Sequence, residues 1–503
     1  MRITGGIYPA LEFPAPIPET SEMNEPVESL PLRRTVYTLL IVVAAAIAAA
    51  RILSVTRLPM ATFADNDRSR WDTVRALVDN GTYAIGERLS EKGPDGKLVD
   101  RGIITEKDYE TIDKVLHPET HQFFSSKPPL LATIAASEYW LLKHLLGWSI
   151  TENRWQVIPT ILLTVNWLPL VVYLFLLARL VEHFGATDWG RLFVLTAGCF
   201  ATILTGFMNT FNNHTVATCS ALFALYAFFR IWCDCERRPD LYFATGFFAG
   251  FTAANELPAV AFVVALFLML LRRTPWRALL LFVPGAMVPL AAFFLTNYLA
   301  VGQWKPAYSE FGGPWYEFEG SFWAIAPGET KHGIDWAYQT ENSLTYAFHV
   351  LAGHHGIFSL SPIYLLTVAG AVGSLYLGRR RTADQAEAPR GGAIKPRSGV
   401  RGIALLTLIL SAVVIGFYIF GVNERNRNYG GWTNGLRWLM WLIPLWLLSM
   451  LPAADWLSAR RWGRGLACIL LAVSVFSANY VSQNPWRHPW LYDLMESRGW
   501  INY

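Results

Sequence analysis

Acidic and basic side chains alternate in a short stretch that follows the first apolar segment. The stretch reads A-D-N-D-R-S-R-W-D and contains Asp65, Asp67, Arg70 and Asp72. A calcium loop would need glycine at its sixth position and glutamate at its twelfth, where this sequence has arginine and alanine. The pattern therefore indicates either a chemically active carboxylate or a solvated helix start, with Asp65 or Asp67 as its N-cap.

A second stretch, H-Q-F-F-S-S-K-P-P-L-L, places Lys127 at the predicted start of a helix. Ser125 or Ser126 would cap this helix, and Pro128 and Pro129 would occupy its first turn. The positive end of a helix dipole disfavours a lysine and attracts anions. Lys127 and free helix amides could therefore bind a phosphate at the membrane surface. A lysine that snorkels to the interface is the alternative interpretation.

Two histidine-containing stretches and one glutamate also have residue types suited to binding. His214 in N-T-F-N-N-H-T lies on a short predicted turn, and Glu256 is the main charged residue near the apolar segments. His354 and His355 in A-G-H-H-G precede another apolar segment. Paired imidazoles could bind phosphate or a metal there, or cap the helix.

Two adjacent glycines lie among aromatic residues between Asn426 and Trp438. Glycine permits close approach of a ligand to the backbone, and Tyr429 or Trp432 could stack on a sugar ring. Arg437 at the end of this run is a candidate phosphate ligand. Aromatic belts at any membrane interface are the alternative explanation.

The elements that must position these residues are membrane helices. The 503-residue chain is 53% hydrophobic, 14% aromatic and only 16% charged, with a formal charge of +4. Soluble domains are about 25% charged. The composition favours an all-α polytopic membrane protein and excludes disorder, a coiled coil, collagen and a nucleic-acid-binding arm as main interpretations. The five cysteines lack neighbouring soft ligands, so neither a disulfide framework nor a zinc site is expected of them.

About eleven segments approach the ~17 to 25 apolar residues that a bilayer crossing needs. They are residues 35–50, 157–178, 190–208, 214–232, 241–254, 257–271, 278–299, 357–377, 402–421, 437–453 and 465–481. Basic loops at 235–239, 272–277, 379–401 and 460–464 fall on alternate turns, which predicts a cytoplasmic N-terminus. A helix over 128–147 is expected to lie along the interface.

This topology divides the chain into three parts. Residues 1–34 are expected to form a disordered cytoplasmic tail, residues 35–482 a polytopic membrane domain, and residues 483–503 an extracytoplasmic tail. Residues 58–156 and 300–356 then form large extracytoplasmic loops. Most of the polar chemistry would therefore lie on the extracytoplasmic side.

The order of these features resembles the polyprenyl-phosphate-dependent C-type (GT-C) membrane glycosyltransferases, in particular the branch of the aminoarabinose transferase and the protein mannosyltransferases. The resemblance rests on D-R-S-R-W at 67–71, K-P-P-L at 127–130 and G-W-S-I-T-E-N-R-W at 147–155, and it covers about residues 55–185. Two positions depart from the family pattern. Asp67-Arg68 replaces an acidic pair, and Asn255-Glu256 stands where the family has a basic residue.

The resemblance implies an inverting transferase of the plasma (inner) membrane. It would move a sugar from a polyprenyl-phosphate donor to a lipid, glycan or protein acceptor of the cell envelope. Asp67 is the expected base, with Asp65 as second choice, because a carboxylate must take the proton of the acceptor hydroxyl. Cations must hold the departing phosphate; the expected ligands are Lys127, Arg70, His354, His355 and Arg437. The other substrate-site candidates are His214, Glu256, Tyr429 and Trp432.

No nucleic-acid partner and no required cofactor are expected, although D-N-D offers a divalent metal two carboxylates. Two other functions stay open. A transporter or lipid flippase usually carries ionisable groups near the bilayer midplane and often has internal repeats, both of which are scarce here. A non-catalytic GT-C relative that binds lipid or an envelope partner is kept open by the altered acidic motif.

Overall fold

The computed structural model describes residues 29–54, 64–94, 96–326, 328–384, 397–422, 424 and 427–503. Most of the predicted disordered tail lies outside these residues. Helix α1 (Ser29–Ser54) nevertheless begins inside it, so residues 29–34 are helical. Arg33 is 4% exposed; its Nε donates to Glu182 at 3.0 Å, and its Nη1 also bonds to Asp188. These bonds hold the start of α1 against the neighbouring helices.

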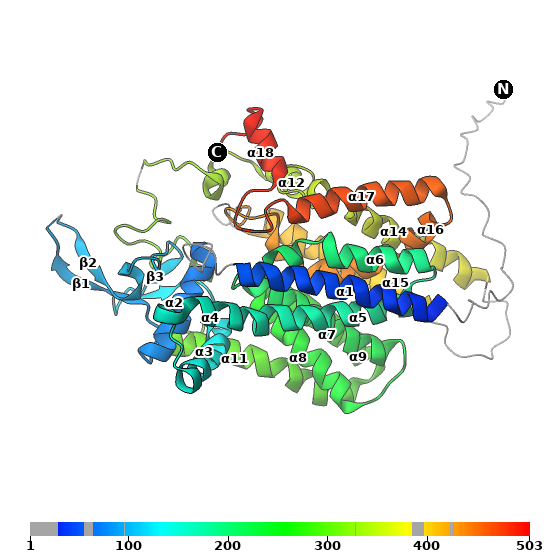
Figure 1. Ribbon diagram of the computed structural model, residues 1–503, viewed down its shortest axis with the longest axis horizontal. Helices are drawn as coiled ribbons and strands as arrows, with labels where there is room; N and C mark the ends of the chain where they lie inside the picture. The colour runs from blue at the N-terminus through cyan, green and yellow to red at the C-terminus, as the bar shows by residue number, and fades with distance from the viewer. Residues whose placement is uncertain are drawn as a thin grey trace, which may run out of the picture.

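Long apolar helices lie side by side in the body of the molecule (Figure 1). Among the described residues, eight continuous helical segments are long and apolar enough to cross a membrane, and each coincides with a predicted span. The chain is therefore an integral membrane protein. Besides α1, these segments contain α4 (Ile150–Leu162), α5 (Leu168–Phe184), α6 (Asp188–Phe200), α7 (Asn213–Trp232), α10 (Pro275–Arg277), α11 (Val283–Val301), α15 (Arg397–Gly416), α16 (Ile443–Ser458) and α17 (Arg461–Asn479).

The other three predicted spans are also helical: α8 (Pro239–Asn255), α9 (Val260–Arg273) and α14 (Tyr364–Asp384). They are shorter, or have a shorter apolar part, so a count of eleven crossings stays a prediction. Helix α14 begins at Tyr364 rather than near 357 because proline disfavours helical backbone in the residue before it, here Ser361. Residues Ile357–Leu360 form the separate short helix α13.

A four-stranded antiparallel sheet lies at one end of the helices (Figure 1). Its strands are β1 (Gly86–Lys92), β2 (Leu98–Arg101), β3 (Lys114–Leu116) and β4 (Gln122–Ser125), in the spatial order β2-β1-β4-β3. The all-α expectation is therefore wrong for this loop. The β1–β2 hairpin projects away from the body, whereas β3 and β4 lie close to it.

Short apolar runs explain the inner strands. Val115 pairs with Phe124 across β3 and β4, and both pack with Trp315 and Tyr316 from the second large loop. Phe123 faces the other way, into a small core with Ile103 and its neighbours. The alternation of side chains along a strand places these two sets on opposite faces. The sheet therefore connects the two large loops.

Helices α2 (Asp65–Asp79) and α3 (Pro129–Leu146) flank the sheet in sequence. The predicted interfacial segment 128–147 is thus confirmed as a helix, with Pro128 as its N-cap and Gly147 as its left-handed C-cap at φ 70°. Two further short helices, α12 (Ser343–Leu351) and α18 (Trp490–Ser497), lie near the C-terminal end of the chain in space (Figure 1).

Close packing of α8 on α11 sets the position of Glu256, which follows α8. A β-carbon on Gly246 would lie 2.1 Å from Phe282 O, and one on Gly250 would lie 2.5 Å from Ala286 O. Only glycine permits this approach of two backbones. The C-terminal end of α8 is thereby fixed beside the start of α7.

Candidate active site

Asp67 and Arg70 lie one turn apart at the start of α2. The N-cap is Ala64 rather than Asp65 or Asp67, and Asp67 Oδ1 accepts a hydrogen bond of 3.1 Å from Ala64 N. Asp67 is 1% exposed and Arg70 is 3% exposed. The predicted helix start is therefore confirmed, but it is buried rather than solvated. The helix dipole favours a negative charge at this position.

Lys127 forms an ion pair with Asp113, a carboxylate that no sequence motif marks. Lys127 Nζ lies 3.0 Å from Asp113 Oδ1, and the two side chains are 21% and 10% exposed. Asp113 directly precedes β3, and Lys127 follows β4 by two residues. Because β3 and β4 pair with Lys114 opposite Ser125, the sheet brings the two charges together.

Hydrogen bonds attach α2 to these strands. Ser125 Oγ lies 2.9 Å from Ser69 Oγ on α2 and accepts a hydrogen bond of 3.1 Å from Lys127 N. Ser125 therefore bonds to the β4–α3 connection instead of capping α3 as predicted. Asp65 Oδ1 accepts a hydrogen bond of 2.9 Å from Ile112 N. Asp65, the second choice for the base, thus binds the backbone just before Asp113.

Asn213 connects α2 to the ends of two apolar helices. Its Oδ1 accepts a hydrogen bond of 2.5 Å from Arg70 Nη2, and its Nδ2 donates to Glu256 Oε1 at 2.9 Å and to Asn255 O at 2.7 Å. His214 Nδ1 bonds to the same Glu256 oxygen. An amide has one accepting and one donating end, so it can join a cation to a carboxylate.

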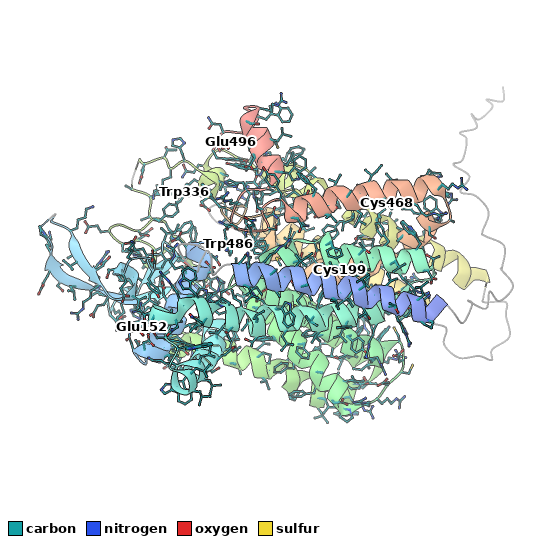
Figure 2. The ribbon with its side chains drawn as sticks, in the orientation of Figure 1. Glu152, Cys199, Trp336, Cys468, Trp486 and Glu496 are labelled. Carbon is teal, nitrogen blue, oxygen red and sulfur yellow. The ribbon has the colours of Figure 1, made fainter. Side chains whose placement is uncertain are left out.

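Arg437 reaches the same region from the turn that precedes α16. The charges of Asp113, Glu256 and Asp335 all act on its guanidinium. Its Cζ lies 4.7 Å from the ring centroid of Trp486, which is labelled in Figure 2. We call Asp67, Arg70, Asp113, Lys127, Asn213, His214, Glu256, Asp335 and Arg437 the charged cluster.

Gly430 and Gly431 pass along the edge of the charged cluster with φ of 90° and 71°. A β-carbon on Gly431 would lie 2.9 Å from Asp335 Oδ1, and one on Gly430 would lie 3.4 Å from Arg437 Nε. The predicted close backbone approach is therefore present. In this structure the approaching groups are side chains of the protein itself.

Burial is the main influence on the charges outside the membrane spans. It lowers the pKa of Arg70 to about 10, although neighbouring carboxylates act in the opposite direction. Burial also lowers the pKa of Lys127, and the positive charges of Arg70 and Arg437 add to this effect. The pKa of the buried Asp335 is raised to about 6. Because the three cations repel one another, a further anion bound between them would be stabilised.

A small, partly open cleft lies beside Lys127, with about 20 Å³ accessible to a water-sized group. Tyr83, Asn297 and Tyr308 line it together with residues 124–129. The cleft therefore gives a small polar group access to Lys127 from the side of α11.

The other predicted site residues lie in a second group. His354 and His355 are 0% and 1% exposed and lie close to Tyr429, with ring centroids 4.6 and 5.2 Å away. We call Glu341, His349, His354, His355, Tyr429, His488, Tyr492 and Tyr503 the histidine cluster. Trp432 is 62% exposed and its ring centroid lies 4.9 Å from that of His488. Among the described residues, no hydrogen bond, ion pair or ring contact joins His354 or His355 to Lys127, so their predicted binding of the same phosphate stays a prediction.

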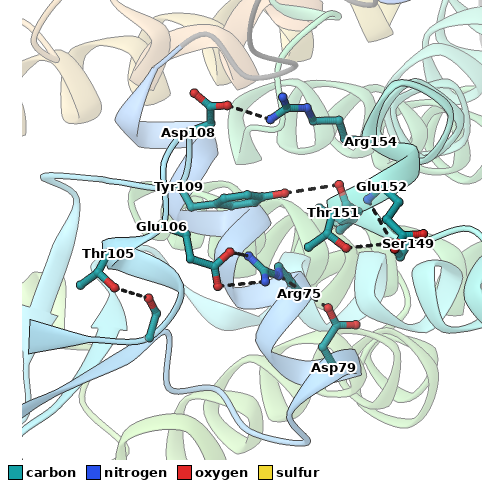
Figure 3. A network of polar contacts seen from close by, with 12 residues as sticks. Arg75, Asp79, Thr105, Glu106, Asp108, Tyr109, Ser149, Thr151, Glu152 and Arg154 are labelled. Atoms are coloured by element: carbon teal, nitrogen blue, oxygen red, sulfur yellow. Dashed lines mark hydrogen bonds and ion pairs between the residues drawn. The ribbon is translucent and has the colours of Figure 1, made fainter.

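Residues 147–155, one of the segments on which the family resemblance rests, connect α4 to the sheet loop (Figure 3). Arg154 Nη1 lies 3.1 Å from Asp108 Oδ2, and Tyr109 Oη donates to Ile150 O at 3.3 Å. On the neighbouring face of α2, Arg75 Nη1 lies 2.7 Å from Glu106 Oε2. These bonds hold α2 in place from the side opposite the charged cluster.

Sequence reasoning missed Asp113, Asn213 and Asp335. Asp113 and Asp335 occur in long loops with many other charges, and only the fold brings them to Arg437. Asn213 could have been suspected as a site residue from the sequence, because it directly precedes the candidate His214. Asp72, the last carboxylate of the same acidic and basic stretch, lies on the face of α2 that is influenced by Arg68 and Arg75.

Comparisons with known proteins found no matching family model and no matching curated protein. Among solved structures, the chain is similar to the oligosaccharyltransferase of Archaeoglobus fulgidus. The apo form has a TM-score of 0.44 at 10% identity, with 90% of this chain and 56% of that chain covered. The complex with Zn and sulfate gives 0.43 at 12% identity, covering 90% and 53%. The chain therefore spans little more than half the length of these structures.

Proposed function

We propose that this protein is an inverting membrane glycosyltransferase. It takes a sugar from a polyprenyl-phosphate donor and transfers it to a lipid, glycan or protein of the cell envelope. The observation that carries the proposal is the meeting of Arg70, Lys127 and Arg437 with buried carboxylates beside an open cleft. Transfer of this kind needs both types of group at one place.

The three cations fit the departing polyprenyl phosphate. Lys127 lines the cleft. The positive charges of Arg70 and Arg437 act on the Lys127 ammonium group. Guanidinium groups can bind phosphate oxygens through two parallel hydrogen bonds, and an ammonium group adds a compact charge. As the bond between sugar and phosphate breaks, negative charge grows on the phosphate. Cations already in place stabilise that charge without reorganising.

Asp67 is the proposed base, and Asp113 has a different role. Asp67 lies one turn from Arg70 at the start of α2, where the helix dipole favours a negative charge. Asp113 neutralises Lys127 until a phosphate takes its place. His214 and Glu256 then form the acceptor side of the site, held to Arg70 through Asn213.

The proposed active face is extracytoplasmic. The charged cluster lies at the end of the helices that carries the sheet (Figure 1). The basic loops that follow α7, α9 and α16 lie at the opposite end, and Arg277 Nη1 donates to Arg237 O at 2.6 Å between the first two of them. Basic loops favour the cytoplasmic side, which supports a plasma-membrane protein with a cytoplasmic N-terminus.

The proposal can be tested by transfer of radiolabelled sugar. Purified full-length protein would be given a panel of polyprenyl-phosphate sugars together with cell-envelope fractions. The variants are Asp67→Asn and Lys127→Ala, with Asp240→Asn and Lys305→Ala as matched controls. Asp240 pairs with Arg238 and Lys305 pairs with Glu310, both on exposed surfaces.

Donor-dependent transfer that is lost in both site variants and kept in both controls would support the enzyme and identify its donor. Transfer that survives Asp67→Asn would refute the base assignment. If folded wild-type protein transfers no sugar from any donor, the transport or lipid-binding alternatives would take its place.

A further inference from the structure

The histidine cluster gathers several metal-ligating atoms in a buried place. Glu341, His349 and His354 each offer one ligand atom, and these atoms lie within 4.8 Å of one another. Tyr503 Oη lies 2.5 Å from Glu341 Oε1 and 2.6 Å from His354 Nε2. Tyr429 donates to the other Glu341 oxygen at 2.6 Å.

The hydrogen bonds determine which nitrogens carry protons. His355 Nε2 lies 3.2 Å from Thr433 O, and a carbonyl oxygen can only accept, so this nitrogen carries a proton. In a neutral His355 ring the lone pair is then on Nδ1. His354 Nδ1 lies 2.5 Å from that lone pair and must donate to it. In the neutral His354 ring, Nε2 therefore has the free lone pair.

This arrangement has more hydrogen-bond acceptors facing one another than protons to place between them, so the cluster needs one additional cation. The Tyr503 hydroxyl has a single proton, but it lies between two acceptors, His354 Nε2 and Glu341 Oε1. His349 Nε2 lies 3.9 Å from Glu341 Oε1, and no hydrogen bond among the described residues fixes the His349 tautomer, because its buried Nδ1 has no partner there. Lone pairs that face one another in a buried site are unfavourable unless a proton or a metal ion lies between them.

We infer that the histidine cluster is a structural site for a zinc-class divalent metal ion. His349 and His354 would bind through their Nε2 atoms, Glu341 through a carboxylate oxygen and Tyr503 through its hydroxyl oxygen. Imidazole nitrogens select such metals over magnesium and calcium, which prefer oxygen ligands. Two histidines and a carboxylate, with a fourth oxygen, match four-coordinate zinc sites.

The surroundings of these ligands also fit a metal site. Zinc bonds of ~2.0 to 2.2 Å place neighbouring ligand atoms about 3.4 Å apart. On binding, His349 would therefore move toward Glu341, from 3.9 Å, and the Tyr503 hydroxyl would move away from Glu341 and His354 by roughly 1 Å. The bond from His354 Nδ1 to His355, and from there to Thr433 O, fixes the tautomer and the ring orientation, as outer-shell partners do. The ion would link the loop around Glu341 and His354 to Tyr503.

The test measures metal directly and does not depend on transferase activity. Full-length protein without a polyhistidine tag would be purified in detergent, incubated with Zn²⁺, dialysed, and analysed by inductively coupled plasma mass spectrometry. We expect stoichiometric zinc in the wild type and at least a tenfold loss in His349→Gln and His354→Gln. His488→Gln is the matched control, because this half-buried histidine lies nearby and is not one of the proposed ligands, and it should retain zinc.

Two spectroscopic measurements need no variant, so they hold even if the variants fail to fold. Cobalt(II) bound in the wild type should give the visible absorption of a four-coordinate site, and X-ray absorption of the zinc form should report nitrogen and oxygen neighbours only. Folded wild-type protein that retains neither metal would overturn the inference and leave a shared proton as the cation. Undiminished zinc in both histidine variants would overturn it as well.

Discussion

The ion pair between Lys127 and Asp113 gives the sharpest test of the proposed site. At 3.0 Å, two unit charges attract each other by about 5 kcal/mol at an effective dielectric constant near 20. Desolvation offsets much of this attraction, and charged hydrogen bonds contribute a net ~1.5 to 3 kcal/mol. A donor phosphate must compete with Asp113 for Lys127. The two residues should therefore have coupled effects on donor binding.

The perturbations are Lys127→Ala, Asp113→Asn and the double variant. Lys127→Ala removes a phosphate ligand and leaves Asp113 unpaired, so KM for the donor should rise by roughly 10- to 150-fold, which corresponds to ~1.5 to 3 kcal/mol. Asp113→Asn should lower KM for the donor and preserve kcat. In the double variant the unpaired carboxylate is absent, so the loss caused by Lys127→Ala should be smaller by about 2 kcal/mol.

The assay is steady-state sugar transfer at varied donor concentration, with kcat and KM obtained separately for each variant. If the two single effects add to within about 0.5 kcal/mol, the residues do not share a phosphate site and the reasoning is wrong. A fall in kcat of roughly 10²- to 10⁴-fold in Asp113→Asn, with KM unchanged, would identify Asp113 instead of Asp67 as the base.

Three further substitutions test the supporting structure through the apparent Tm in detergent. Asn213→Asp should reduce stability by about 2 to 4 kcal/mol, because two amide donors become an oxygen that faces Glu256; an unchanged Tm would contradict the assigned amide orientation. Asp72 is fully buried, neither oxygen has a hydrogen-bond partner, and burial raises its pKa well above the ordinary value. Folding then takes up a proton, so stability falls as pH rises from the unfolded pKa through the higher folded pKa. Asp72→Asn should therefore reduce the fall in Tm as pH rises above about 4, and an unaltered slope would refute this. Gly431→Ala places a β-carbon at positive φ and against Asp335, whereas Gly499→Ala places one at positive φ in open space. The loss of stability in Gly431→Ala should therefore exceed the ~1 kcal/mol expected of Gly499→Ala. Equal losses of stability would argue against the contact with Asp335.

The membrane helices were predictable from the sequence because their signal is local. Long apolar segments must be helical in lipid, where every backbone polar group needs a partner within the segment. The helix start near Lys127 was predictable for the same reason, since two prolines fix its first turn. The caps were not, because Ser125 and Asp65 had several possible partners and the fold engaged them with β4–α3 and with Ile112.

The charged cluster was predictable only in part. Asp67, Arg70, Lys127, His214, Glu256 and Arg437 were all candidates, and the structure brings them together. Asp113 was missed because its position depends on pairing of β3 with β4, two strands of only three and four residues. Such short strands carry little periodicity. His354 and His355 were assigned to the phosphate because no sequence pattern reveals their contact with the distant Tyr503.

The hairpin formed by β1 and β2 is a suitable insertion site for a fusion partner in electron cryo-microscopy. Its turn contains Gly93 and Gly96, whose backbone bonds close it without contact to the charged cluster or the histidine cluster. Exposed loop tips tolerate inserted domains well. A rigid fusion partner placed there would add recognisable mass outside the detergent micelle, which would help to align particles of the protein.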